Sequence, residues 1–264
     1  MGLGLGNINA NRSQAKVTHF TKAMHFDGSA DFEQAVDDNA TTFGDATDDA
    51  DFSIITWFKL DGVSGENPIL LKLNEYEITA TGAELSILLY DNGTSAYRKW
   101  TTSGTTLAVN KWYCAIFVAN GDGSGGIAQA EMALHLNGVK KVHGSGITMA
   151  EDGYTAMHNK GNHRTGNDGS NYLDGFVAAV GIFNIAFGDA ACARIYNNGV
   201  PTNIAKRHGI SSSNIKAYWT YGNASGDTIA AVQDLSATEI DMAQSNASKQ
   251  PALITGANVR TGVN

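Results

Sequence analysis

The 264-residue chain has few charged side chains, three prolines and two cysteines. Charged residues make up 17% of the chain, whereas about a quarter is typical of globular domains. Two cysteines are too few for a disulfide framework, and both stand in apolar sequence, so we expect Cys114 and Cys192 to be buried free thiols. No run of about 18 apolar residues is present, which excludes a membrane-spanning helix and gives no reason to expect a membrane partner.

The charge balance is acidic. Eighteen basic residues against 26 acidic ones give a formal net charge of −8. Binding to nucleic acid needs a basic face for the phosphates, so we expect no nucleic-acid partner. Residues 1–9 have no basic segment and no continuous apolar segment, and we therefore expect that no signal peptide directs secretion.

Glycine is abundant, with 30 residues, and short apolar segments recur at intervals of about ten to fifteen residues. Residues 52–59 alternate, with Phe52, Ile54 and Phe58 on one face and Ile55 and Trp57 on the other. Further strands are predicted at residues 85–90, 112–118, 132–136, 177–184 and 216–221. Asn137-Gly138 predicts a type I′ hairpin. The one predicted helix covers residues 190–196, with Asp189 as its N-cap and Gly199 and Pro201 at its end. This pattern predicts an all-β sandwich or barrel.

Five motifs in order carry a family resemblance. They are Met24-His-Phe-Asp-Gly-Ser-Ala-Asp-Phe, Asp51-Phe-Ser-Ile-Ile-Thr-Trp-Phe-Lys, Lys111-Trp-Tyr-Cys-Ala-Ile-Phe-Val, Leu134-His-Leu-Asn-Gly-Val and Leu173-Asp-Gly-Phe-Val-Ala-Ala-Val-Gly-Ile-Phe-Asn. This series resembles laminin G-like, concanavalin A-like lectin/glucanase domains. The resemblance implies a two-sheet antiparallel jelly-roll sandwich over residues 23–200. We expect residues 1–22 to form an N-terminal arm and residues 201–264 a C-terminal extension that packs on the sandwich.

The closing segment, residues 217–228, resembles the tail of laminin G-like proteins from bacteriophage particles. This resemblance implies a non-enzymatic virion structural protein, either a capsid decoration (cement) protein or a fibre component. Such a protein is assembled in the host cytoplasm, which agrees with the expected absence of a signal peptide. Its expected partners are capsid or tail proteins, and low charge with strands apolar on both faces favours a homo-oligomer, for which we expect a trimer.

The alternative function is a carbohydrate-binding module for receptor recognition or adhesion, with surface glycans as partners. Aromatic rings can stack on sugar rings, and the candidates for this role are Trp57, Tyr76, Tyr90 and Trp100. For Trp57 ordinary core packing is the competing interpretation.

Calcium is the only cofactor that the residues suggest. Asn120, Asp122, Ser124 and Glu131 hold the oxygen-ligand positions 1, 3, 5 and 12 of a twelve-residue calcium loop. The competing interpretation is a long glycine-rich hairpin loop. Residues 45–51 and 167–171 form two further acidic clusters that fit either a cation site or solvated turns.

No catalytic residues are expected. Glu239-Ile-Asp-Met-Ala-Gln is similar to the Glu-x-Asp-x-x-Glu motif of laminarinase-type glycoside hydrolases. Gln244 stands where the second glutamate would be, and an amide cannot donate and reclaim a proton. The segment also follows the last predicted core strand, so we expect the protein not to be an enzyme.

Overall fold

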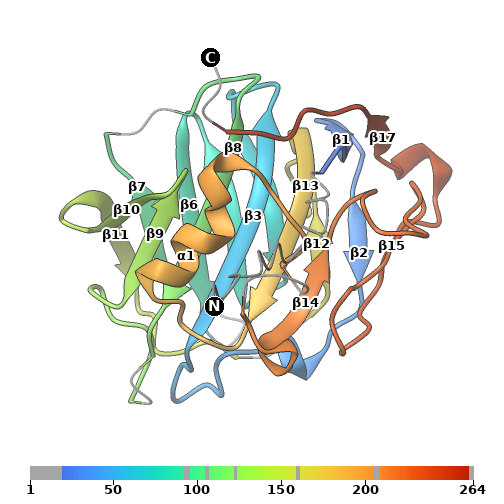
Figure 1. Ribbon diagram of the computed structural model, residues 1–264. Coiled ribbons are helices and arrows are strands. Elements are labelled where there is room, and N and C mark those ends of the chain that lie inside the picture. The colour runs from blue at the N-terminus through green and yellow to red at the C-terminus, as the bar shows by residue number, and fades with distance from the viewer. Residues whose placement is uncertain are drawn as a thin grey trace, which may run out of the picture.

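The computed structural model describes residues 20–91, 96–104, 107–121, 124–158, 161–204 and 209–261. Figure 1 shows two layers of strands, with the helix α1 lying across the outside of one of them. The N-terminal arm expected at residues 1–22 lies almost wholly outside the described residues, and the first strand begins at Lys22.

Sheet A is the layer beside the helix. Its strands run in the order β10-β9-β8-β3-β13, and the free edge of β13 pairs with β1 along one half and with β14 along the other. β17 adds to the far edge of β1. The members are β1 (Lys22–Asp27), β3 (Phe52–Leu60), β8 (Trp112–Ala119), β9 (Met132–Leu136), β10 (Val139–His143), β13 (Asp174–Phe183), β14 (Ile215–Trp219) and β17 (Ala252–Thr255).

Sheet B is the second layer, and its strands run in the order β11-β7-β6-β5-β4-β12-β2-β16-β15. A short parallel pairing between β10 and β11 joins the two layers at one edge. The members are β2 (Glu33–Ala35), β4 (Glu66–Lys72), β5 (Tyr76–Thr81), β6 (Glu84–Tyr90), β7 (Tyr97–Thr102), β11 (Gly146–Asp152), β12 (His163–Thr165), β15 (Ala231–Val232) and β16 (Met242–Ala243).

The main core lies between the two sheets. Ile54 and Phe117 from sheet A join Ile78, Ile87 and Trp100 from sheet B in one cluster of buried side chains. Successive residues of a strand point to opposite faces, so each strand contributes every second side chain to this core. The predicted all-β sandwich is thereby confirmed.

The outer face of sheet A forms a second core beneath α1 (Asp189–Tyr196). Cys192 of the helix lies in one buried cluster with Trp57 of β3 and Cys114 of β8, and both thiols are buried and free, as predicted. The predicted N-cap is wrong by one residue, because Gly188 holds that position and Asp189 lies in the first turn. The Asp189 carboxylate instead accepts a hydrogen bond from the Lys140 ammonium at 2.8 Å.

Residues with left-handed backbone conformation lie at the end of α1 and in the turn between β9 and β10. Asn197 has a φ of 46° and caps the helix after Tyr196, the last residue of the predicted helix. Asn137 and Gly138 have φ of 51° and 78°, which confirms the type I′ hairpin. The described residues also contain short 3₁₀ turns, namely η1 (Asn39–Thr41), η2 (Asn197–Gly199), η4 (Ser212–Asn214) and η5 (Ala247–Lys249).

The segment predicted as a C-terminal extension supplies strands to both layers. β14 pairs with β13, β17 pairs with β1, and β16 pairs with β2. β13 before residue 200 and β14 after it pair within sheet A. The domain boundary at residue 200 stays a prediction. Within the described ranges, no helix has the length and apolar character needed to cross a membrane.

Candidate functional site

Three of the four aromatic residues proposed to stack on sugars are buried. Trp57, Tyr76 and Trp100 are 1%, 0% and 1% exposed. The indole of Trp57 points outward from sheet A, but Tyr196 of α1 stacks on it with ring centroids 6.4 Å apart. Tyr76 and Trp100 face the core between the sheets. None of the three rings offers a face to a ligand, so the prediction for them is corrected.

Tyr90, the fourth candidate, is partly exposed at the end of β6. It lies on the outer face of sheet B, where Glu77 of β5 also lies. Its hydroxyl donates a hydrogen bond to Glu77 Oε2 at 2.9 Å.

The predicted calcium loop forms a hairpin connection between β8 and β9. The Asn120 N–H donates to the Glu131 carbonyl at 3.0 Å. The Glu131 carboxylate accepts the Ala128 N–H within its own turn. Ser124 is exposed, and Asp122 lies outside the described residues. These contacts agree with the hairpin interpretation, and calcium at this loop stays a prediction.

The acidic cluster at residues 45–51 holds loops in place. Asp49 is fully buried, and its carboxylate accepts the N–H groups of Ile127 and Met157 at 2.8 Å each and the hydroxyl of Tyr154. Burial raises the pKa of Asp49, and these three hydrogen bonds oppose the shift. The carboxylate therefore ties the 124–127 loop to the 154–157 segment.

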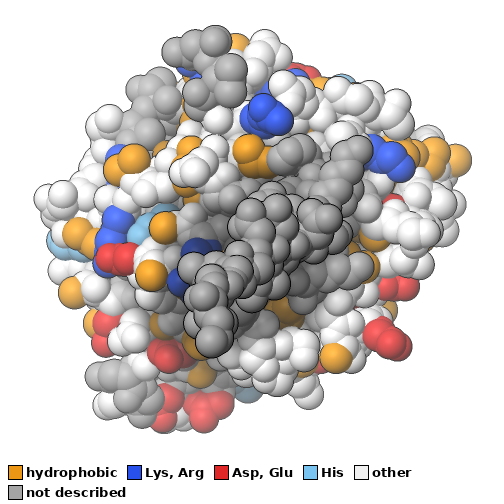
Figure 2. Space-filling model, in the orientation of Figure 1, with side chains coloured by type: hydrophobic (Ala, Val, Ile, Leu, Met, Phe, Trp, Pro, Cys, Tyr) orange, Lys and Arg blue, Asp and Glu red, His pale blue; other side chains and the backbone are white. Residues whose placement is uncertain are grey.

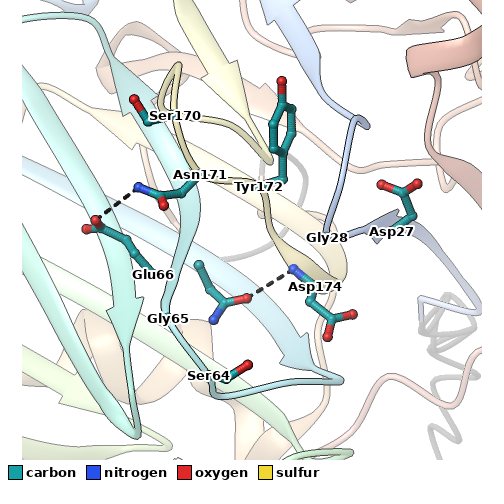
Figure 3. A pocket seen from close by; sticks show the side chains of 10 residues that line it. Asp27, Gly28, Ser64, Gly65, Glu66, Ser170, Asn171, Tyr172 and Asp174 are labelled. Carbon is teal, nitrogen blue, oxygen red and sulfur yellow. Dashed lines mark hydrogen bonds between the residues drawn. The ribbon is translucent and has the colours of Figure 1, made fainter.

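A pocket of about 350 Å³ opens at one edge of the sandwich, and we call it the edge pocket. Figure 3 shows the loop that bears Ser170, Asn171 and Tyr172 on one side of it and the start of β4 on the other. Its lining residues share a polar character apart from two glycines. They are Asp27, Gly28, Ser64, Gly65, Glu66, Asn67, Ser170, Asn171, Tyr172 and Asp174.

Two amide side chains organise the edge pocket. Asn67 Oδ1 accepts the backbone N–H of Asp174 at 3.0 Å, and its Nδ2 is a buried donor with no acceptor among the described residues. Asn171 Nδ2 donates to Glu66 Oε2 at 3.3 Å. Tyr172 is partly exposed and supplies the pocket's one aromatic ring. The pocket therefore presents both donors and acceptors beside an aromatic face.

Asp27 keeps its negative charge at the mouth of the edge pocket. Its partial burial opposes ionisation, but hydrogen bonds from the Ser29 hydroxyl and from the N–H groups of residues 29–31 outweigh it and lower the pKa of Asp27 to about 2. Asp174 lies in a group with His25 and Asp61, whose Nε2 and Oδ2 are 3.1 Å apart.

A carboxylate cluster borders the edge pocket, formed by Glu66, Glu77 and Asp168. One oxygen of each lies within 4.8 Å of the others. Glu77 is 5% exposed. Burial raises its pKa to about 7, with a hydrogen bond from Tyr90 opposing the shift and the charges of Glu66 and Asp168 adding to it. Asp168, from the predicted acidic cluster at 167–171, accepts the N–H groups of the next residues of its loop.

The hydrolase-like segment is not arranged for catalysis. Glu239 and Asp241 are exposed in the C-terminal segment, outside the central strands of either sheet. Gln244 is buried and donates from Nε2 to the Phe32 carbonyl at 3.3 Å.

Sequence reasoning missed Glu66, Asn67, Glu77, Tyr172 and Asp174. These residues come from three separate segments of the chain and form no local motif. One usable signal was the polar residue at every second position of residues 77–81, which marks a face of β5 away from the core.

A sequence profile described as the concanavalin A-like lectin/glucanases superfamily matches residues 33–193. The chain belongs to this superfamily. No curated protein sequence matches the chain.

Several solved structures align with the chain. A Bacteroides ovatus protein provisionally named as carbohydrate binding aligns with a TM-score of 0.59 and 12% identity over 94% of this chain and 63% of its own length. The chain thus spans less than two thirds of that protein. The CBM40 of a Ruminococcus gnavus IT-sialidase, bound to α2,3 sialyllactose, aligns with a TM-score of 0.43 and 9% identity over 67% of this chain and 99% of its own length. Domains LG4-5 of mouse laminin α1 align with a TM-score of 0.39 and 14% identity over 63% of this chain and 44% of their own length.

Proposed function

We propose that the chain is a non-catalytic carbohydrate-binding module and that the edge pocket is where a glycan binds. The observation that carries the proposal is the pocket lining, which combines amides, hydroxyls and carboxylates with one aromatic ring. Sugars are bound by hydrogen bonds to their hydroxyls and by contact between C–H groups and an aromatic face. Membership of a lectin/glucanase superfamily and the fold of the Bacteroides ovatus protein support the same class of function.

The charge of the edge pocket favours neutral glycans. Asp27, Glu66 and Asp174 line it together, and no lysine or arginine among the described residues does. Like charges at short range repel, so uronic or sialic acids should bind less well than neutral hexoses with adjacent hydroxyls. The volume of about 350 Å³ lies near the lower end of small-molecule pockets, which are about 300–1,000 Å³, so we expect recognition of a short glycan segment.

The first experiment is a glycan array followed by calorimetric titration of the best neutral ligand. Tyr172→Ala and Asn171→Ala should each weaken binding at least tenfold, because they remove the aromatic face and an amide donor. The matched control is Gln233→Ala, which removes an exposed amide outside the pocket and should leave affinity unchanged. Equal affinities for all four proteins would place the glycan elsewhere and contradict the proposal.

The non-catalytic part of the proposal has its own test. The chain should release no reducing sugar from β-glucans on long incubation. Turnover that disappears in Glu77→Gln would overturn it, because Glu77 is a buried carboxylate with a pKa near that of a general acid.

The virion role stays a prediction. The large hydrophobic side chains that are exposed in the described residues come from separate strands and loops, namely Val36, Leu73, Val109, Val139, Ile229 and Ile254. On the face shown in Figure 2, the coloured hydrophobic side chains are likewise scattered. Stoichiometric recovery of the chain with purified capsids would support this role, and light scattering would test the trimer.

A further inference from the structure

The outer face of β5 carries a buried carboxylate that is only half satisfied. Glu77 is 5% exposed, and its Oε2 accepts the Tyr90 hydroxyl at 2.9 Å. Its Oε1 is buried and has no hydrogen-bond partner among the described residues. An unpaired buried carboxylate oxygen is costly, and such groups call for an unseen partner.

The neighbours of Glu77 add negative charge. Oxygens of Glu66 and Asp168 lie within 4.8 Å of it and of each other. Asn171 Nδ2 donates to both of these carboxylates, at 3.3 Å and 2.8 Å. In the described parts of the chain, none of the ion pairs to lysine, arginine or histidine involves any of the three. The charge of Lys99 acts on Glu77 and lowers its pKa, but Lys99 forms no ion pair with the cluster. The cluster therefore holds up to three negative charges without an ion-paired lysine, arginine or histidine among the described residues.

A second unsatisfied oxygen lies on the same face. Thr79 is two residues along β5 from Glu77, and strand alternation places both side chains outside the core. Its Oγ1 is buried and also has no partner among the described residues. The strand thus presents two unsatisfied oxygens, one charged and one neutral.

We propose that Glu66, Glu77 and Asp168 bind a calcium ion at the border between the edge pocket and the outer face of sheet B. Hard oxygen donors of this kind are what calcium prefers. Ca–O distances of about 2.3–2.6 Å let ligands on opposite sides of the ion stand about 4.6–5.2 Å apart. Three oxygens that all lie within 4.8 Å of one another can therefore bind one calcium ion. Water would complete the shell.

The calcium site is separate from the loop that the sequence suggested. Glu131 of that loop has its carboxylate on the Ala128 N–H. Glu66, by contrast, lines the edge pocket and belongs to the cluster. An ion there would lie beside a bound glycan, yet metal binding needs no glycan and is tested without one.

The experiment is calorimetric titration of the apo chain with CaCl₂, together with terbium luminescence excited through tyrosine. Tyr90 donates to Glu77, so it stands close enough to transfer energy to a terbium ion held by the cluster. We expect one ion per chain, reversal by chelator, and binding at least tenfold weaker in Glu77→Gln and in Asp168→Asn. Gln is isosteric and can still accept the Tyr90 hydroxyl, and circular dichroism will show that each variant folds.

The matched control is Glu84→Gln, an exposed glutamate on the neighbouring strand β6 that should leave binding unchanged. Three outcomes would overturn the proposal. The first is no binding of either ion at millimolar concentration. The second is unchanged binding in Glu77→Gln. The third is binding lost in Glu131→Gln and kept in Glu77→Gln, which would place the ion in the 120–131 loop. Calcium binding without any glycan binding would refute only the proposed function.

Discussion

Glu33 is a buried carboxyl group whose ionisation should make stability fall as pH rises. It lies on β2 and is 0% exposed, and neither of its oxygens has a hydrogen-bond partner among the described residues. Burial raises its pKa from 4.5 to about 8. Between these values the unfolded chain releases the proton and the folded chain keeps it, so the free energy of unfolding decreases with pH in this window.

The magnitude follows from the size of the shift. Because the folded chain holds one more proton than the unfolded chain, the free energy of unfolding falls by about 1.4 kcal/mol per pH unit between the two pKa values. The fall over the whole window is about 5 kcal/mol. The Gln side chain of Glu33→Gln cannot ionise, so the free energy of unfolding of this variant does not fall in this way. Its free energy of unfolding should exceed that of the wild type by less than about 1 kcal/mol at pH 5 and by about 4 kcal/mol at pH 8.

The assay is urea unfolding followed by tryptophan fluorescence at both pH values. Comparing each variant with the wild type at the same pH removes the contribution of other titrating groups. Glu84→Gln, which changes an exposed glutamate, should show no such pH dependence. If the difference between Glu33→Gln and the wild type were the same at pH 5 and pH 8, the argument from burial would be refuted.

Three further changes test the packing of the sandwich. Lys72 and Glu75 form a 2.8 Å ion pair with both side chains 0% exposed, so Lys72→Met should cost about 3–5 kcal/mol in urea unfolding by leaving a buried charge unpaired. Trp57→Ala should cost about 3–5 kcal/mol by leaving a cavity but should not change glycan affinity in calorimetry, whereas a loss of affinity would restore its predicted sugar-stacking role. Tyr154→Phe removes a donor from the buried Asp49 and should lower the thermal midpoint in calorimetry by the equivalent of about 1–3 kcal/mol.

Strand positions and faces were largely predictable because they depend on local alternation. Phe52, Ile54 and Phe58 face the core between the sheets, and Ile55 and Trp57 face the other way, as predicted. The exposure of Trp57 was not predictable from β3, since the helix that covers it comes much later in the chain. Apolar residues on both faces of a strand predict that both faces are buried, but they do not predict which element covers each face.

The candidate site was harder to predict because long-range pairing builds it. On β5, Tyr76 faces the core and its neighbour Glu77 faces outward. Neighbouring residues of a strand lie on opposite faces, so the prediction that chose Tyr76 for binding chose the face that is buried in the core. The edge pocket needs the end of β1, the start of β4 and the loop before β13 to meet. The sequence around Asn67 or Tyr172 does not predict that these three segments come together.

The most direct measurement is a crystal structure of the chain soaked with the best neutral glycan from the array. We expect density for a sugar ring in the edge pocket, against Tyr172 and within hydrogen-bond distance of Asn67 or Asn171. A glycan bound at any other place on the surface, with the edge pocket filled only by water, would contradict the account.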